Sequence, residues 1–416
     1  MKRNYYLVVL IFLVFFVISF LTNILGSINP NVSDSFHLSG VMTGMLPFAF
    51  FIAYALMSIP SGMMVQRYQE KLSMITAWSV ATFGAVLFAM YPGFPVFLVS
   101  LFLIGSGMAI LQVAINPLLR ETGGEKHFAF LSVFAQLVFG SASYLSPAVY
   151  SYLVTNLKGE SVSYGFLLSI LSKITPVEMP WVSLYWIFAV VSMLMVVVIA
   201  VSRFPKVDRK EDEIVGAWET HLELFRSRTI WLFFIGIFAY VGTEQGIANW
   251  ISEFLRTYHG FAPEVEGAGT VGWFWGMLTI GCLLGLVLLK LLDSKLVLKI
   301  FSISAIVVLG ITLWGSSTVA LFGFPALGFC LSVMWSVIFS LALNSIPKYH
   351  GTFSGILCTG IAGGAIVPLI IGQLKDMIGL RAGMMILFVT LGYILSISFW
   401  AKPLVANETL GNKKEG

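Results

Sequence analysis

The chain has 416 residues, of which 58% are hydrophobic and 11% are charged, and its mean hydropathy is +0.92. Soluble globular proteins contain about 45–50% apolar and about 25% charged residues, so this composition excludes a soluble globular protein. Its 35 phenylalanines also exclude a disordered chain. The net charge is +4 but no basic run is typical of nucleic-acid binding, so we expect no nucleic-acid partner. Cys282, Cys330 and Cys358 lie in apolar segments without CxxC spacing, which predicts neither a disulfide framework nor a metal site.

Twelve apolar segments reach the roughly 20 residues that a helix needs to cross a bilayer. The first six lie near residues 5–26, 41–66, 72–92, 95–119, 128–153 and 182–202, and the second six near 229–254, 267–290, 296–315, 318–346, 352–374 and 380–401. The first segment follows Lys2 and Arg3, but it is longer than the h-region of a signal peptide and lacks an A-x-A-like cleavage site. We therefore expect a retained first span. The predicted fold class is all-α integral membrane, with twelve transmembrane helices in two six-helix bundles.

The most charged stretch of the chain, residues 203–228, separates the two sets of six spans. We expect an N-terminal six-helix bundle at 1–203 and a cytoplasmic linker at 204–228, with a short amphipathic helix near Ile214–Phe225. A C-terminal six-helix bundle at 229–402 and a cytoplasmic tail at 403–416 follow.

The distribution of basic residues predicts the orientation in the membrane. With the N-terminus inside, only five of the 24 lysines and arginines lie on outer segments: Lys158, Lys173, Arg256, Lys375 and Arg381. Cytoplasmic loops are enriched in these residues, so we expect a multi-pass protein of the inner (cytoplasmic) membrane with both termini in the cytoplasm.

The junctions after the second and the eighth spans have similar sequences, which predicts an internal repeat. The corresponding positions are Gly62, Arg67 and Lys71 at the first junction and Gly285, Lys290 and Lys295 at the second. Glycine allows helices to approach closely, and we expect the basic residues to anchor tight cytoplasmic turns.

This layout, with a basic Gly-x4-Arg turn, resembles the major facilitator superfamily. Four stretches resemble its fucose–galactose–glucose symporter family of sugar–proton permeases. They are Ile59-Pro60-Ser61-Gly62 with Arg67 and Lys71; Ala114-Ile115-Asn116-Pro117; Tyr240-Val241-Gly242; and Ile338-Phe339-Ser340-Leu341 followed by Gly363-Gly364-Ala365-Ile366-x-Pro368. The resemblance implies that two bundles rock about a central cavity and that the substrate is a sugar.

The sequence departs from this family at the carboxylates of its proton-linked members. These members carry an Asp four residues before a Pro in the first span, where this chain has Gly26 before Pro30. They carry a Glu four residues before Asn-Pro in the fourth span, where this chain has Gln112 before Asn116. The proton mechanism of the family therefore cannot simply be carried over to this chain.

Glu244 is the ionisable residue that lies well inside a predicted span, where a charge costs about 2.5–3.5 kcal/mol on insertion scales. It belongs to a polar segment of the seventh span that also contains Gln245, Asn249 and Trp250. We predict that Glu244 binds the coupling ion, a proton or sodium, near the bilayer midplane. The alternative is a protonated Glu that hydrogen-bonds a neighbouring helix and has a structural function.

Amides and tryptophans supply the candidate substrate-binding residues, because amides match sugar hydroxyls and aromatic faces match the apolar face of a pyranose. The candidates are Asn23, Gln112, Asn116, Gln136, Gln245, Asn249, Trp250 and Trp335. The alternatives are interhelical hydrogen bonding for the amides and anchoring at the membrane interface for the tryptophans.

The chain lacks the GxxxxGK[ST], GxSxG and HExxH patterns, so we expect neither an enzyme nor a cofactor beyond the coupling ion. We predict a secondary active transporter that imports a neutral sugar or sugar derivative by alternating access and functions as a monomer in the lipid bilayer. The alternatives are an exporter of drug-like or other hydrophobic solutes, a sugar uniporter and a non-transporting nutrient sensor. The sensor is disfavoured by the short tail after Lys402.

Overall fold

A computed structural model describes residues 5–123, 128–157, 165–204, 223–346 and 349–404. These residues form helices and contain no strand. The predicted amphipathic helix near 214–225 and the tail at 403–416 lie almost entirely outside this part of the chain.

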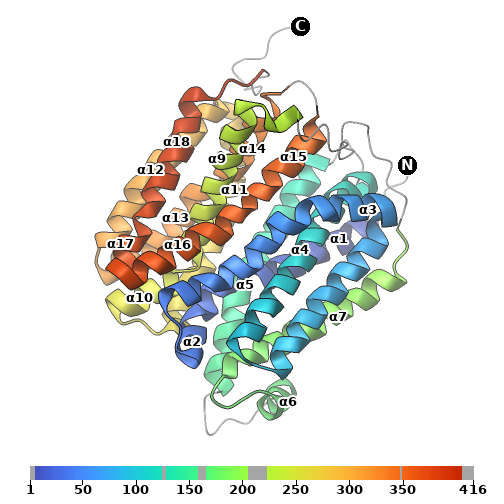
Figure 1. Cartoon of the computed structure of the whole chain (residues 1–416), viewed down its shortest axis with the longest axis vertical. Helices are drawn as coiled ribbons and strands as arrows, with labels where there is room; N and C mark the ends of the chain where they lie inside the picture. Colours follow the sequence, from blue (N-terminus) through green and yellow to red (C-terminus); the bar gives the residue numbers. More distant parts are fainter. Residues whose placement is uncertain (1–4, 124–127, 158–164, 205–222, 347–348, 405–416) are drawn as a thin grey trace.

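Figure 1 shows two helix bundles that lie side by side. The first contains α1 (Tyr5–Thr22), α2 (Leu25–Phe36), α3 (Gly40–Met90), α4 (Phe94–Gly123), α5 (Phe128–Leu157), α6 (Phe166–Ile174), η2 (Pro180–Val182) and α7 (Ser183–Val201). The second contains α9 (Arg228–Ala248), α10 (Ile251–His259), η4 (Pro263–Gly267), α11 (Ala268–Leu291), α12 (Ser294–Trp314), α13 (Ser317–Leu331), α14 (Met334–Leu343), α15 (His350–Thr359), η5 (Gly360–Ala362), α16 (Gly363–Ile378), α17 (Leu380–Met384) and α18 (Ile386–Trp400).

Eleven helical segments of the described chain are long and apolar enough to cross a membrane. The 30-residue helix α5, which contains no charged residue, is the twelfth. The predicted fold class is confirmed.

Several predicted spans differ from the observed helices at their ends and centres. The first span continues to Phe36 and is interrupted between Thr22 and Leu25. The second and third spans form one continuous run, α3, whose direction changes at Gln69 (φ 65°, ψ 168°). The tenth span is divided into α13 and α14, and the eleventh is divided by the 3-10 turn η5. Hydropathy locates spans but carries no information about where a helix bends.

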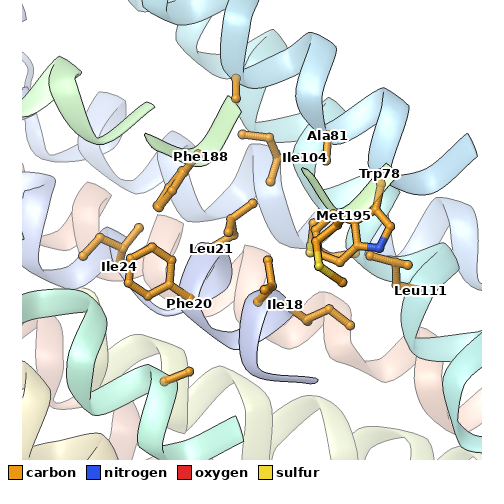
Figure 2. Close-up of a cluster of buried hydrophobic side chains, with 14 of the residues drawn as sticks. Ile18, Phe20, Leu21, Ile24, Trp78, Ala81, Ile104, Leu111, Phe188 and Met195 are labelled. Atoms are coloured by element: carbon orange, nitrogen blue, oxygen red, sulfur yellow. The ribbon is translucent and has the colours of Figure 1, made fainter. Parts of the chain in front are cut away.

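Each bundle has its own hydrophobic core. The core of the first bundle takes its buried side chains almost entirely from residues 7–199, and the second from residues 224–401. Figure 2 shows part of the first core, in which the labelled side chains are Ile18, Phe20, Leu21, Ile24, Trp78, Ala81, Ile104, Leu111, Phe188 and Met195. Lipid is as apolar as these residues, so close packing, rather than exclusion of water, stabilises such bundles in a membrane.

The predicted repeat has a clear structural counterpart. The Lys71 ammonium donates to the carbonyl oxygens of Ala200 (2.7 Å), in the last turn of α7, and Ser202 (2.8 Å), just past its end. The Lys295 ammonium donates to the carbonyl oxygen of Ala401 (2.9 Å), just past α18. Each lysine therefore joins the third span of its bundle to the sixth. We call this end of the molecule, where α7 and α18 end, the Lys71 end.

The other predicted turn residues lie nearby in their helices. Gly62 is buried in α3, and the Arg67 guanidinium lies 5.3 Å from the centre of the Tyr68 ring. Lys290 is in the last turn of α11, and Gly285 packs against Val333 at the break between α13 and α14.

The opposite end, which contains α10, the start of α3 and the end of α16, is where the two bundles are bonded together. We call it the α10 end. The Asp376 carboxylate accepts hydrogen bonds from the backbone N–H groups of Gly40 (2.6 Å) and Val41 (2.9 Å), in the first turn of α3. The Arg256 guanidinium donates to the Asp34 carboxylate at 2.6 Å.

Burial alone would lower the pKa of the Arg256 guanidinium, but Asp34 and Glu253 offset this effect, so its pKa is raised above the ordinary value. Arg256 therefore remains charged across the physiological pH range. Glu253 also accepts from Lys375 (2.7 Å), so one carboxylate of α10 joins two cations.

Glycines bring the two bundles into backbone contact at this end. A Cβ added to Gly26 would lie 2.0 Å from the carbonyl oxygen of Ala248. A Cβ added to Gly40 would lie 2.4 Å from the carbonyl oxygen of Gly372, and one at Gly44 would lie 2.8 Å from Cα of Leu369. No larger side chain fits at these positions while the α10 end is closed.

Candidate substrate and coupling-ion site

The seventh span is interrupted beside its most polar residues. Helix α9 ends at Ala248 and α10 begins at Ile251, with Asn249 and Trp250 between them. The Asn249 side-chain amide donates to the carbonyl oxygen of Gln245 at 2.9 Å. Asn side chains that bond the backbone in this way compete with helical hydrogen bonding, which explains why the helix ends here.

Glu244 lies one turn before this break and is partly exposed. Its Oε2 atom accepts a hydrogen bond from the Tyr240 hydroxyl at 2.5 Å, and its Oε1 atom accepts one from the Gln245 amide at 3.1 Å. The carboxylate therefore has two neutral donors. Among the described residues, no cation lies within ion-pairing distance of it, so a bound proton or metal cation could supply the missing positive charge.

The hydrogen bonds continue from Glu244 to the first bundle. Gln245 Oε1 accepts from the Asn249 amide at 3.1 Å, and the carbonyl oxygen of Asn249 accepts from the Asn29 amide of α2 at 2.9 Å. Gln245, Asn249 and Asn29 are all buried. The predicted residues Glu244, Gln245 and Asn249 are thus brought together, and Asn29 joins them from the other bundle.

The two candidate tryptophans occupy different environments. Trp335 of α14 is partly exposed, and its ring centre lies 6.0 Å from that of Tyr240, which places it beside the Glu244 group. Trp250 is 1% exposed, donates from its indole nitrogen to the carbonyl oxygen of Pro368 (3.2 Å) and lies beneath the Lys375 ammonium. In this conformation Trp250 joins the seventh span to the eleventh at the α10 end.

The candidate amides of the first bundle lie at the break after α1, on α4 and on α5. Asn23 lies at the break between α1 and α2 and donates to the Ser143 hydroxyl of α5 at 2.8 Å. Gln112 is partly exposed in α4, and Gln136 is exposed on α5. Asn116 is in α4, but its side chain is outside the description.

Gly26, the position where the family resemblance leads one to expect an Asp, faces the break in the seventh span. The carbonyl oxygen of Ala248 occupies the space that a side chain would need. The missing carboxylate of the first span is therefore replaced by a direct backbone contact between the bundles.

Residues that sequence reasoning missed are Asn29, Asp34 and Asp376, which all bond across the bundles. Asn29 lies beside Pro30 in α2, a segment that also contains Ser27 and Asn31, so its sequence surroundings do not single it out. Asp34 and Asp376 lie near the ends of spans, where charged residues are ordinary.

Two surface cavities of the described chain lie away from Glu244. One of about 310 Å³ lies between α5 and α11, beside Tyr144 and Trp273. The other, of about 250 Å³, is lined by residues that include Asp34 and Arg256. In the described part of the chain, no three His, Cys, Asp or Glu residues are grouped so that they could hold a metal ion.

Comparison with known proteins identifies the family. The model of the Major Facilitator Superfamily matches residues 11–368. The chain belongs to the Major Facilitator Superfamily. As a member of this superfamily it is a multi-pass membrane transporter and not an enzyme.

Two relatives within the Major Facilitator Superfamily match nearly the whole chain. The glucose/galactose transporter of Brucella abortus biovar 1 (strain 9-941) is 30% identical over 387 residues, which cover 92% of this chain and 90% of the relative. The L-fucose–proton symporter of Escherichia coli (strain K12) is 24% identical over 388 residues, covering 88% and 86%. The resemblance to the sugar–proton permeases is confirmed.

Solved structures from the superfamily have the same fold. The crystal structure of a variant of the Escherichia coli fucose–proton symporter has a TM-score of 0.68 at 21% identity, covering 95% of this chain and 98% of that one. A bacterial homologue of the human lysosomal transporter Spinster, in an inward-facing and unoccupied conformation, has a TM-score of 0.72 at 17% identity, covering 95% and 96%.

Proposed function

We propose that this transporter imports a neutral hexose or a related sugar and that a proton or sodium ion bound at Glu244 drives the import. The observation that carries the coupling proposal is the Glu244 carboxylate, which lies at a helix break beside Trp335 and has neutral donors on both oxygens. Carboxylates within spans are uncommon and mark ion pathways in transporters. The relatives named for glucose, galactose and fucose support the choice of substrate class.

We further propose that the Lys71 end faces the cytoplasm and that the protein functions as a monomer in the inner membrane. The described basic residues Lys71, Lys290 and Lys295 lie at the Lys71 end, and in the sequence most lysines and arginines fall in the segments assigned to the cytoplasmic side, which supports this orientation. The bonded α10 end would then face outward, and the conformation would be one in which the outer entrance is closed.

Uptake into proteoliposomes tests the proposal. Radiolabelled glucose, galactose and fucose would be offered with an imposed proton gradient, an imposed sodium gradient or neither. We expect accumulation of at least one sugar to follow one of the gradients, because substrate and ion favour the same conformational switch. In Glu244→Gln, which keeps the size of the side chain but removes its charge, we expect accumulation to fall to equilibration.

The control is Glu178→Gln, a carboxylate exposed in the loop before η2, which should leave accumulation unchanged. If the sugar only equilibrates across the membrane in the wild type, with or without a gradient, the uniporter alternative is favoured. The specific support for this alternative is that Gly26 and Gln112 occupy the positions of the family's two carboxylates. No uptake of any sugar would favour an exporter of hydrophobic solutes.

A further inference from the structure

The cavity beside Tyr144 and Trp273 lies between the two bundles and has a volume of about 310 Å³. We call it the α5–α11 groove. One wall consists of residues of α5 between Tyr144 and Tyr152, and the other consists of residues of η4 and α11 between Val265 and Trp273. Tyr144, Tyr152 and Trp273 are 40%, 56% and 51% exposed, so the groove opens at the surface of the protein.

Glycines determine the shape of the groove. A Cβ added to Gly140 of α5 would overlap the Thr279 side chain of α11, and one added to Gly272 would lie 3.2 Å from the carbonyl oxygen of Tyr144. A Cβ added to Gly269, which lines the groove about one turn closer to the α10 end, would meet nothing within 4 Å. The two helices therefore touch at Gly140 and diverge toward the α10 end.

The surroundings of the groove indicate what fills it. Helix α5 and the segment Pro263–Leu291 both cross the bilayer, so an opening between them at the protein surface faces lipid. None of the residues that line the groove carries a charge. An empty gap would forfeit the dispersion contacts of its walls, and an ordered water molecule needs several polar partners. A hydrocarbon chain of the bilayer therefore suits the groove better than water does.

Three polar atoms around the groove have no hydrogen-bond partner among the described residues. They are the hydroxyl oxygens of Tyr144 and Tyr152 and the indole nitrogen of Trp273, whose ring centre lies 5.1 Å from that of Tyr144. Tyrosine and tryptophan side chains with an apolar ring and a free polar atom are typical of the membrane interface, at the level of the lipid headgroups. Three of them at one groove favour a phospholipid, which offers both a chain and polar oxygens.

The charges beside the groove favour one class of headgroup. Glu264 and Glu266 flank Val265 at the rim, and Glu264 lies close enough to Tyr150 of α5 to interact with it electrostatically. No lysine or arginine of the described chain lines the groove. Two carboxylates attract the ammonium group of a zwitterionic headgroup and repel an anionic headgroup.

We propose that the α5–α11 groove binds one acyl chain of a phospholipid with a zwitterionic headgroup. The chain lies between the two helices, and the free polar atoms of Tyr144, Tyr152 and Trp273 face the polar part of the lipid. Because the two walls belong to different bundles, a lipid that contacts both of them favours the conformation in which the α10 end is closed. The proposed sugar and coupling ion have no part in this binding; the orientation proposed above only assigns the lipid to the outer leaflet.

The test measures lipid binding to the full-length, delipidated protein by native mass spectrometry. Palmitoyl-oleoyl-phosphatidylethanolamine, which is zwitterionic, and palmitoyl-oleoyl-phosphatidylglycerol, which is anionic, are titrated separately. We expect the first phosphatidylethanolamine to bind more tightly than later ones and at least about fivefold more tightly than the first phosphatidylglycerol, since one charge near the lipid surface contributes about this factor. Replacement of both carboxylates, Glu264→Gln with Glu266→Gln, should abolish the preference between the lipids.

A substitution within the groove tests where the lipid binds. Ala148 is exposed and lines the groove, so Ala148→Phe fills it with a ring, and the first lipid should then bind only as weakly as later ones. The matched control is Val389→Phe on α18, which is 71% exposed and does not line the groove, and its lipid binding should equal that of the wild type. Thermal denaturation checks that each variant folds, and Ala148→Leu replaces Ala148→Phe if that variant does not.

Fluorescence provides a second measurement of the position. Phosphatidylethanolamine with brominated chains quenches nearby tryptophans, and the difference between the wild type and Trp273→Phe gives the signal of Trp273. At about one bound lipid per chain we expect this signal to be quenched in the wild type and retained in Ala148→Phe.

Four results would overturn the proposal. They are equal affinities for the two lipids, a first lipid that binds no more tightly than later ones, wild-type binding in Ala148→Phe, and an unquenched Trp273. A species with the mass of two chains that forms as lipid is removed, and that Ala148→Phe prevents, would instead assign the groove to a second copy of the chain. Uptake measurements are not needed for any of these outcomes, so the proposed function stands or fails separately.

Discussion

Gly26 connects the sequence comparison to the mechanics of the protein. The superfamily relatives that couple transport to protons are expected to have an Asp here, and this chain has no side chain at all. The carbonyl oxygen of Ala248 occupies that space, so the first span and the broken seventh span touch through their backbones. Such contact is available only to glycine, and it exists only while the α10 end is closed.

Gly26→Ala should therefore shift the protein toward the conformation in which the α10 end is open. The added methyl group must displace the Ala248 carbonyl, and overpacking of this kind costs roughly 1–3 kcal/mol. Cysteine labelling at the α10 end from the outer side of intact cells measures the shift as an increase in reaction rate.

Two glycines serve as controls for this variant. A Cβ at Gly105 would lie 2.3 Å from the carbonyl oxygen of Phe50, within the first bundle, so Gly105→Ala should lower thermal stability without changing the labelling rate. A Cβ at Gly269 would meet nothing within 4 Å, so Gly269→Ala should change neither. Equal labelling of Gly26→Ala and the wild type would contradict the interpretation of this contact.

At the scale of helices, the two lysine contacts show that the halves of the chain share a construction. Lys71 and Lys295 each place an ammonium group at the carbonyl end of the last helix in their bundle. A positive charge at a helix C-terminus is stabilising because the unpaired carbonyls there carry partial negative charge. The third and sixth spans of each bundle are thereby held together.

Lys71→Met and Lys295→Met should each lower the stability of the folded protein by roughly 1 kcal/mol, through loss of the charge at the helix end. Thermal denaturation in detergent, followed by the loss of the monodisperse species in size-exclusion chromatography, measures the effect. Lys290→Met is the control, because Lys290 makes no hydrogen bond or ion pair with another described residue. If Lys290→Met lowers the stability as much as the other two variants, loss of a basic charge at the junction, and not loss of the contact with the helix end, explains the effect.

The features that the bilayer imposes on the sequence could be predicted from it. A bilayer requires about 20 apolar residues per helix, so the spans, the division into six and six and the exceptional position of Glu244 could all be found from hydropathy. The breaks at Asn23, Asn249 and Ser332 could not, because a hydrophobic segment has the same composition whether or not it bends. The short helix α6, between the fifth and sixth predicted spans, was missed for a related reason: nine residues are too few to give a clear pattern.

Only the part of the candidate site that lies on a single helix could be predicted from the sequence. Gln245 and Asn249 could be assigned to one helix face from their spacing of four residues. Asn29 could not be joined to them, because a separation of 220 residues in the chain gives no local signal. The burial of Trp250 under Lys375 also depends on how the seventh and eleventh spans pack, which spacing alone does not contain.

For the molecule as a whole, the bonds between the bundles define the conformation. Among the described residues, hydrogen bonds of Asn29 and Asp376 and the ion pair of Asp34 join the two bundles, all at the α10 end. We expect Asp376 to stabilise the closed α10 end more than the other two residues do. Its two carboxylate oxygens accept from two backbone N–H groups at the positive end of α3, a helix of the other bundle.

Asp376→Asn should open the α10 end in a larger fraction of molecules. An asparagine can accept from one of the two N–H groups, but its own NH₂ group then faces the other, and losing a helix-capping contact costs about 1 kcal/mol. Spin labels attached at Val177→Cys and Val265→Cys, two exposed positions on opposite bundles, report the change as a larger population at long distance.

Asp293→Asn provides the matched control. Asp293 caps α12 inside the second bundle, where it accepts from the backbone N–H groups of Lys295 (2.8 Å) and Leu296 (3.4 Å). Its replacement should lower thermal stability and leave the distance distribution unchanged. A distribution that shifts equally in both variants would show that general destabilisation, and not the contact between bundles, is being measured.

The uneven placement of the helix breaks has a mechanical consequence. In the first bundle, α3, α4 and α5 cross the bilayer without interruption, apart from the change of direction at Gln69 between two spans. In the second bundle, the seventh, tenth and eleventh spans are all divided. An intact helix resists bending, whereas a break supplies a pivot with little elastic resistance. Among the described residues, the first bundle has one divided span, the first, whereas the second bundle has three. We therefore expect bending during the transport cycle to be greater in the second bundle.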